Sequence, residues 1–183
     1  DLPSISDDDR YVAFASQATN LVAGDGNGVE DVFVHDNLTG ATVRISRTPA
    51  GASTDASSRR PWLSSTGRYV AFQSSATNLV AGVAGNHVFR HDRDTDADGV
   101  FDEVGATTTI VVSGGPAGVL GDAASRAYGN SISDNGDRIV FESDATNLVA
   151  GDTNGFDDAY VHIVSTATTV RASITSAGAE PNY

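Results

Sequence analysis

The chain has 183 residues, a formal net charge of −13 at pH 7 and an expected pI near 4.3. A surface this acidic repels nucleic acids and anionic lipids, so we expect neither as a partner. There is no cysteine, so no disulfide forms, and no apolar run approaches the roughly 20 residues of a membrane helix.

The chain begins at Asp1 and contains no methionine. This favours a processed, secreted protein or an excised fragment of a longer one, and we expect an extracellular, cell-surface or periplasmic location. Most of the acidic residues are aspartate, which favours turns and loops that bind hard cations.

One sequence unit occurs three times. Its clearest copy is RYVAFASQATNLVAGDGNGVEDVFVHD at 10–36, and related copies lie at 68–92 and 138–163. Such self-similarity is typical of a repeat protein, in which each copy forms one structural unit.

Each unit predicts four short strands. In the first unit they are Leu2–Ser6, Arg10–Ser16, Asp31–Asp36 and Ala41–Ser46. The second and third are apolar on both faces, as expected for strands buried between packed sheets, whereas the fourth alternates like a half-exposed strand. Asp, Asn and Gly between the strands favour tight turns.

Four antiparallel strands repeated every 50 to 70 residues or so are typical of β-propeller blades. We therefore predict an all-β fold with three four-stranded blades, as a single propeller segment over residues 1–183. The expected blade limits are about 1–58, 59–126 and 127–183.

The motif that opens each unit supports this prediction. PSISDDDRYVAFAS at 3–16, PWLSSTGRYVAFQS at 61–74 and NSISDNGDRIVFES at 130–143 resemble the WD-like repeats of TolB-type propellers. The ATNLVxGDxNGxxD continuation resembles a bacterial, exported branch of that group. The resemblance implies the fold, but such propellers serve as scaffolds, as partner-binding domains and as gates on enzymes.

TolB-type propellers usually close into a ring with six or more blades. We therefore expect that the three blades of this chain do not close a ring alone. The end blades would then expose apolar sheet faces, which favours association. Two copies would complete a six-bladed ring, and an interface that fails to close would build a fibre. The alternative is that the chain is a piece of a longer protein.

Two acidic loops predict calcium sites. Both read D-x-N-G-x-x-D and offer oxygens of the kind that Ca²⁺ prefers, from Asp25, Asn27 and Asp31 in the first unit and from Asp152, Asn154 and Asp158 in the third. The second unit keeps ATNLV but lacks these acids, so we interpret ATNLV as structural. The alternative interpretation of both loops is a set of Asx turns without an ion.

A third acidic segment is an insertion in the second unit, DRDTDADGVFDE at 92–103. It resembles the first part of an EF-hand loop or a thrombospondin type 3 calcium repeat, with Asp94, Asp96 and Asp98 as alternating ligands. Asp102 or Glu103 would complete the shell. The twelfth loop position holds Gly105 instead of the EF-hand glutamate, and the alternative is a solvated acidic hairpin tip.

The remaining candidate residues favour structural roles. His35, His91 and His162 occupy matching strand ends in three blades, too far apart for one zinc site. No nucleophile elbow or Ser–His–acid set is suggested. We expect a non-enzymatic binding or assembly module with structural Ca²⁺. The alternative is a carbohydrate-binding or glycan-processing propeller that acts through its central funnel or Trp62.

Overall fold

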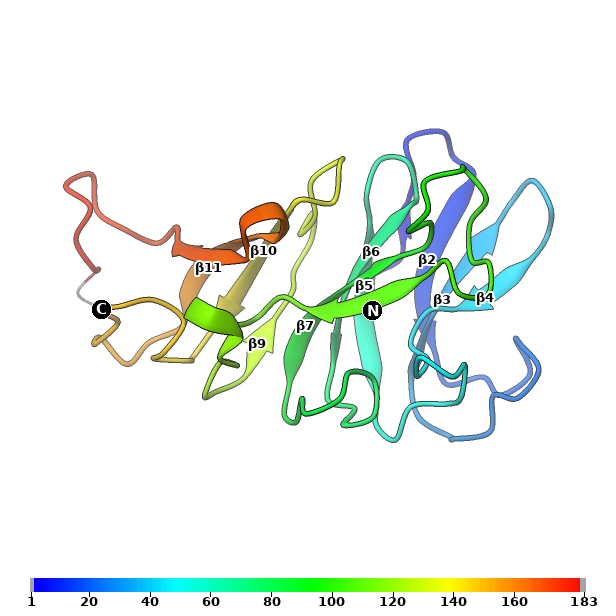
Figure 1. Ribbon diagram of the computed structural model, residues 1–183, viewed down its shortest axis with the longest axis horizontal. Helices are drawn as coiled ribbons and strands as arrows, with labels where there is room; N and C mark the ends of the chain where they lie inside the picture. The colour runs from blue at the N-terminus through cyan, green and yellow to red at the C-terminus, as the bar shows by residue number, and fades with distance from the viewer. Residues whose placement is uncertain (1, 182–183) are drawn as a thin grey trace.

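The computed structural model describes residues 2–181, and these form three antiparallel sheets of four strands each. The sheets follow one another along the long axis of the molecule (Figure 1), and within each sheet the strands lie in sequence order. The first sheet contains β1 (Ser4–Ile5), β2 (Tyr11–Ser16), β3 (Asp31–Asp36) and β4 (Thr42–Arg44). The second contains β5 (Ser58–Leu63), β6 (Tyr69–Ser74), β7 (His87–Asp92) and β8 (Thr108–Val111). The third contains β9 (Ser125–Arg126), β10 (Arg138–Ser143), β11 (Asp158–Ile163) and β12 (Thr168–Arg171).

These sheets confirm the predicted fold class, and we call them blades 1, 2 and 3. Two single 3₁₀ turns, Pro116–Gly118 and Val164–Thr166, lie between strands. Within the described residues, the chain has no helix with the length and apolarity needed to cross a bilayer.

The outer strands of blade 1 are shorter than predicted. β1 covers only Ser4–Ile5 of the expected Leu2–Ser6, in which Pro3 lacks the N–H that a ladder needs. β4 ends at Arg44 because the amides of Ile45 and Ser46 both donate to the carbonyl of Val32, at 2.8 and 3.4 Å, which breaks the regular alternation.

The central strand pair of each blade carries a stacked aromatic pair. Phe14 lies opposite Phe33, Phe72 opposite Phe89, and Phe141 opposite Tyr160. The ring centroids are 5.7, 5.8 and 5.7 Å apart. This repetition fixes which positions of the three blades are equivalent.

The apolar core lies between the blades. One cluster joins blades 1 and 2 and the other joins blades 2 and 3. In both clusters the face of one blade that carries its central Ala or Tyr positions packs on the Val–Phe face of the next. We call these the leading face and the trailing face.

At both junctions a tyrosine of one blade packs closely against a turn glycine of the next. A Cβ on Gly67 would come 2.4 Å from the ring of Tyr11, and a Cβ on Gly136 would come 2.3 Å from the ring of Tyr69. Both glycines have positive φ, +73° and +67°, so the turn and the contact each favour glycine.

An arginine completes each of these junctions. The Nη1 of Arg93 donates to the carbonyl of Gly67 at 2.7 Å, and the Nη1 of Arg90 donates to that of Gly136 at 3.1 Å. Each guanidinium also lies 4.6 Å from the centroid of the tyrosine ring, a cation–π distance. Both junctions thus combine a tyrosine, a glycine and an arginine, but the arginine comes from the blade of the glycine at the first junction and from the blade of the tyrosine at the second.

Candidate functional site

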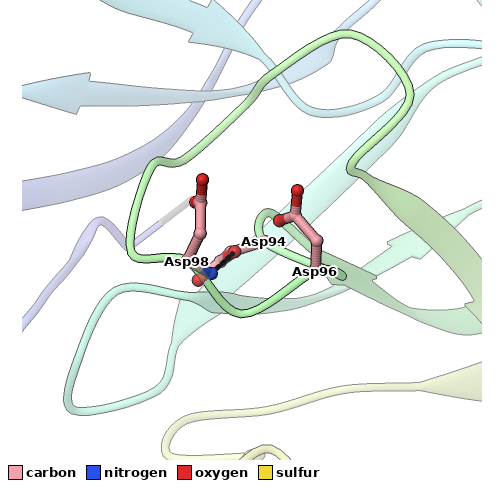
Figure 2. A group of neighbouring side chains, drawn as sticks. All are labelled: Asp94, Asp96 and Asp98. Atoms are coloured by element: carbon pink, nitrogen blue, oxygen red, sulfur yellow. Dashed lines mark hydrogen bonds between the residues drawn. The ribbon is translucent and has the colours of Figure 1, made fainter.

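The acidic hairpin between β7 and β8 brings three predicted ligands together. Carboxylate oxygens of Asp94, Asp96 and Asp98 lie within 4.8 Å of one another. In Figure 2 the side chain of Asp94 lies between those of Asp98 and Asp96. Asp94 is buried, whereas Asp96 and Asp98 are exposed, so the group opens to solvent on one side.

Backbone amides hold the hairpin in this shape. The carboxylate of Asp94 accepts from the amides of Asp98 and Gly99, both at 3.2 Å, and the carboxylate of Asp98 accepts from the amide of Val100 at 2.9 Å. Ala97 and Gly99 have positive φ, +59° and +89°, which bends the chain around Asp94. Asp94 therefore organises the loop, while Asp96 and Asp98 lie exposed beside it.

Mutual repulsion is visible in the pKa values of this group. Burial, together with Asp94 and Asp98, raises the pKa of Asp96. The negative charge of Asp98, aided by Asp96 and Asp94, raises the pKa of Glu103. Glu103 is thus electrostatically part of the cluster, and a divalent cation would relieve the repulsion.

Asp102 does not join the other predicted ligands of the hairpin. Its carboxylate accepts from the Nε of Arg93 at 3.1 Å, and Arg93 is buried and needs a counter-charge. Of the two residues expected to complete the calcium coordination shell, Glu103 is the one whose pKa is raised by the charges of the three aspartates.

The D-x-N-G-x-x-D loop of blade 1 is built around an arginine. The Nη1 of Arg44 lies 3.2 Å from the Oδ1 of Asp25, and both side chains are buried. Asn27 donates to Asp31 at 2.8 Å, and Asp31 also accepts from the hydroxyls of Ser46 and Thr54, at 2.6 and 3.1 Å. The three predicted ligands thus share one loop whose carboxylates already have partners.

Blade 3 repeats this arrangement with one more acid. The Nη1 of Arg171 lies 3.1 Å from Asp158, 2.8 Å from Glu180 and 3.6 Å from Asp152, and Asn154 donates to Asp158 at 3.2 Å. Oxygens of the three acids lie within 4.8 Å of one another. Hydrogen bonds from Thr153 and Arg171 lower the pKa of Glu180.

Blade 2 lacks the acids and the arginine together. Strand register and the shared glycine turn place Val83 where Asp25 and Asp152 lie, and Val111 where Arg44 and Arg171 lie. Val83 is buried in the core, and Val111 packs against the same cluster. An ion pair in two blades is therefore an apolar contact in the third.

The sequence interpretation missed Arg44, Arg171 and Glu180 because it treated each acidic loop alone. Arg44 follows Asp25 by 19 residues, and Arg171 follows Asp152 at the same separation, a spacing that blade 2 does not repeat. That shared spacing was the available signal.

The ATNLV segments of blades 2 and 3 hold the loop that enters each of these blades. The side chain of Asn78 accepts from the amide of Asp55 and donates to the carbonyl of Ser53. The side chain of Asn147 likewise accepts from the amide of Asp122 and donates to the carbonyl of Leu120. These contacts support a structural role for ATNLV in blades 2 and 3. The three equivalent histidines also have matching partners, since each Nδ1 lies 2.8 to 3.0 Å from the threonine hydroxyl across the strand.

Trp62 lies at the inner strands, half-buried between blades 2 and 3. A methyl group on Gly129 would lie 3.3 Å from two atoms of its ring. The indole also lines a cavity of about 210 Å³ with Leu2, Arg60, Ala127, Tyr128 and Gly129. Tyr128 is 46% exposed, and the guanidinium of Arg60 lies 4.8 Å from its ring centroid.

No family model and no curated protein sequence matches the chain. Solved structures do. TolB from Acinetobacter baumannii is 14% identical with a TM-score of 0.52, over 98% of this chain and 33% of that one. A protein assigned as TolB from Agrobacterium tumefaciens is 13% identical with a TM-score of 0.53, over 92% of this chain and 47% of that one.

The tricorn protease is also similar, at 12% identity and a TM-score of 0.51, over 92% of this chain and 18% of that one. The chain thus spans about a third to a half of the length of the TolB structures that it matches. At these identities the likeness shows the fold. With its three four-stranded sheets, the chain is therefore a three-bladed segment with the fold of the TolB-type β-propellers.

Proposed function

We propose that this chain is an exported, calcium-stabilised propeller module that acts in binding or assembly and carries no catalysis of its own. The observation that supports it best is the exposure of apolar side chains on a sheet face at the end of the molecule. On the leading face of blade 3, Val140 is 45% and Val170 48% exposed. In blades 1 and 2 the position of Val140 is held by Ala13 and Ala71, which the next blade buries completely. Such a face favours a partner.

The native mass in calcium buffer, measured by light scattering on a sizing column, tests this proposal. A mass above that of one chain, or capture of a partner by the exposed faces, is the expected result. A chain that stays monomeric and binds nothing would contradict it. Export is tested by fractionating the producing cell, with recovery outside the cytoplasm as the expected outcome.

The calcium proposal centres on the hairpin acids. Asp96, Asp98 and Glu103 would hold the ion over the loop that Asp94 organises, and the bound charge would offset the repulsion among these groups. The loops of blades 1 and 3 stay predicted sites. An ion there would share its carboxylates with Arg44 or Arg171, so we expect weaker binding than at the hairpin.

Removal of calcium should lower the melting temperature, because a ligand that binds only the folded state stabilises it. The measurement is a thermal melt in excess calcium and in chelator. Magnesium in place of calcium is the matched control, since Mg²⁺ keeps its waters and suits a protein cage less well. An identical melt in all three buffers would exclude a structural ion.

A second candidate function is binding of a carbohydrate at the inner strands. The cavity beside Trp62 favours it, because an indole, a half-exposed tyrosine and an arginine are together suited to stack on and hydrogen-bond a sugar. A glycan array with Trp62→Ala and Tyr128→Ala tests this candidate. Binding that both substitutions abolish would support it, and absence of binding by the unaltered chain would exclude it.

A further inference from the structure

We propose that the leading face of blade 3 docks on the trailing face of blade 1 in a second copy of this chain, with Arg138 of one copy paired to Asp9 of the other. This inference rests on the proposed function, because it names the partner of the exposed end faces. It follows from comparing the two junctions inside the molecule with its two ends.

Arg138 occupies the tyrosine position of blade 3. The amide of Tyr11 donates to the Oγ of Ser6 at 2.9 Å, and that of Tyr69 donates to the Oγ of Ser64 at 3.1 Å. The amide of Arg138 makes the same bond to Ser133, at 2.9 Å. An arginine thus stands on the leading face where blades 1 and 2 present a tyrosine.

Asp9 occupies the turn-glycine position of blade 1. Its amide donates to the carbonyl of Ser6 at 3.0 Å, as Gly67 donates to Ser64 at 2.9 Å and Gly136 to Ser133 at 2.8 Å. Asp9 also has the positive φ of these glycines, +59°. Unlike them it carries a side chain, an exposed carboxylate.

The two end substitutions are complementary. Inside the molecule, a Cβ on the glycine would come 2.3 to 2.4 Å from the tyrosine ring, so a tyrosine does not fit over Asp9. A long, flexible arginine does fit, and its guanidinium supplies a positive counter-charge to the carboxylate of Asp9. The side chain of Arg138 is 57% exposed, and its guanidinium lies 3.4 Å from the carboxylate of its neighbour Asp137.

The apolar surroundings of the two ends match in the same way. Val140 is 45% exposed on the leading face of blade 3. On the trailing face of blade 1, Val12 and Phe14 are half-buried, whereas their equivalents Val70 and Phe72 are fully buried. The junction between copies would thus continue the packing seen inside each copy, and two such junctions would close a pair of chains into a ring.

The test replaces the end contact by the internal one. Arg138→Tyr alone should weaken self-association by about tenfold or more, because the ring meets the Cβ of Asp9 and the charge pair is lost. Asp9→Gly alone should also weaken it. The double variant Arg138→Tyr, Asp9→Gly recreates the internal contact and should restore association. Both residues are ones that other blades already use at these positions, so each variant is expected to fold.

The readout is the mass of purified chains by sedimentation at several concentrations, with Val140→Asp and Val104→Asp as a second pair. Val140→Asp puts a charge into the proposed contact, while Val104, fully exposed on the hairpin, is the control. We expect a two-chain mass for the unaltered chain and for Val104→Asp. A monomer at all concentrations would overturn the inference. Association that is unchanged by both Arg138→Tyr and Asp9→Gly would overturn the proposed contact. It would show that the chains assemble through another surface.

Discussion

The guanidinium of Arg44 lies 3.2 Å from the carboxylate of Asp25, and both side chains are buried, with exposures of 6% and 4%. Blade 2 fills the equivalent space with Val111 and Val83. The molecule thus contains both versions of one contact, an ion pair and an apolar pair. Removing one partner of a buried ion pair leaves the other charge buried without compensation, which destabilises the fold. Replacing both partners by apolar groups leaves no buried charge and is often neutral for stability.

Arg44→Val should therefore lower the free energy of unfolding by about 3 to 5 kcal/mol, while Arg44→Val with Asp25→Val should recover most of that loss. The measurement is denaturant unfolding of both single variants and the double variant, analysed as a cycle. A loss in the double variant equal to the sum of the two single losses would show that the pair is not coupled.

Arg171 predicts a change in metal binding. Its removal leaves Asp152, Asp158 and Glu180 with oxygens within 4.8 Å and no guanidinium among them. We expect Arg171→Met to bind one calcium ion more tightly than the unaltered chain, as measured by titration calorimetry. Arg44→Met is the control, since the hydroxyl of Ser53 stands where Glu180 stands in blade 3. Equal affinity in both variants would contradict the prediction.

The hairpin acids should separate into two roles. Asp94→Ala removes the acceptor of two backbone amides. It should lower the free energy of unfolding by about 1 to 3 kcal/mol, and the melting temperature should therefore fall in calcium and in chelator alike. Asp96→Asn should lower it in calcium alone. A melt of Asp96→Asn that still responds fully to calcium would exclude Asp96 as a ligand.

His91 predicts a pH dependence of stability. Burial lowers its pKa to about 3, and its Nε2 has no hydrogen-bond partner among the described residues. The unfolded chain, with a histidine pKa near 6.5, binds this proton first, so stability is full above pH 6.5 and falls as the pH drops toward 3. The slope contributed by one such group is at most about 1.4 kcal/mol per pH unit.

His91→Leu should flatten that slope between pH 6 and 4.5, a range above the pH at which carboxylates with lowered pKa values are protonated. The measurement is denaturant unfolding at several pH values. The slope is the readout, because the substitution also removes the contact with Thr109. An unchanged slope would assign the pH dependence to His87 and His162, whose pKa values burial also lowers.

Much of the fold could be predicted because the information is local. Alternating apolar residues and turn residues define strands, and β3 matches its expected range, Asp31–Asp36. The hairpin acids were found the same way, since Asp94, Asp96 and Asp98 are neighbours in the chain. The partners of the other acidic loops were missed because Arg171 and Glu180 approach Asp152 only through the strand register and the segment after β12.

The contact of Tyr69 with Gly136 has a consequence for folding. Similar repeats in one molecule can mispair, because the leading faces of blades 1 and 2 carry a tyrosine at the same position. A side chain at the turn decides whether a tyrosine is accepted, since Gly67 and Gly136 admit a ring and Asp9 does not. The Asp9 turn of blade 1 therefore disfavours the tyrosine faces of blades 1 and 2 of a neighbouring chain, whereas the two glycine turns are alike and accept either tyrosine.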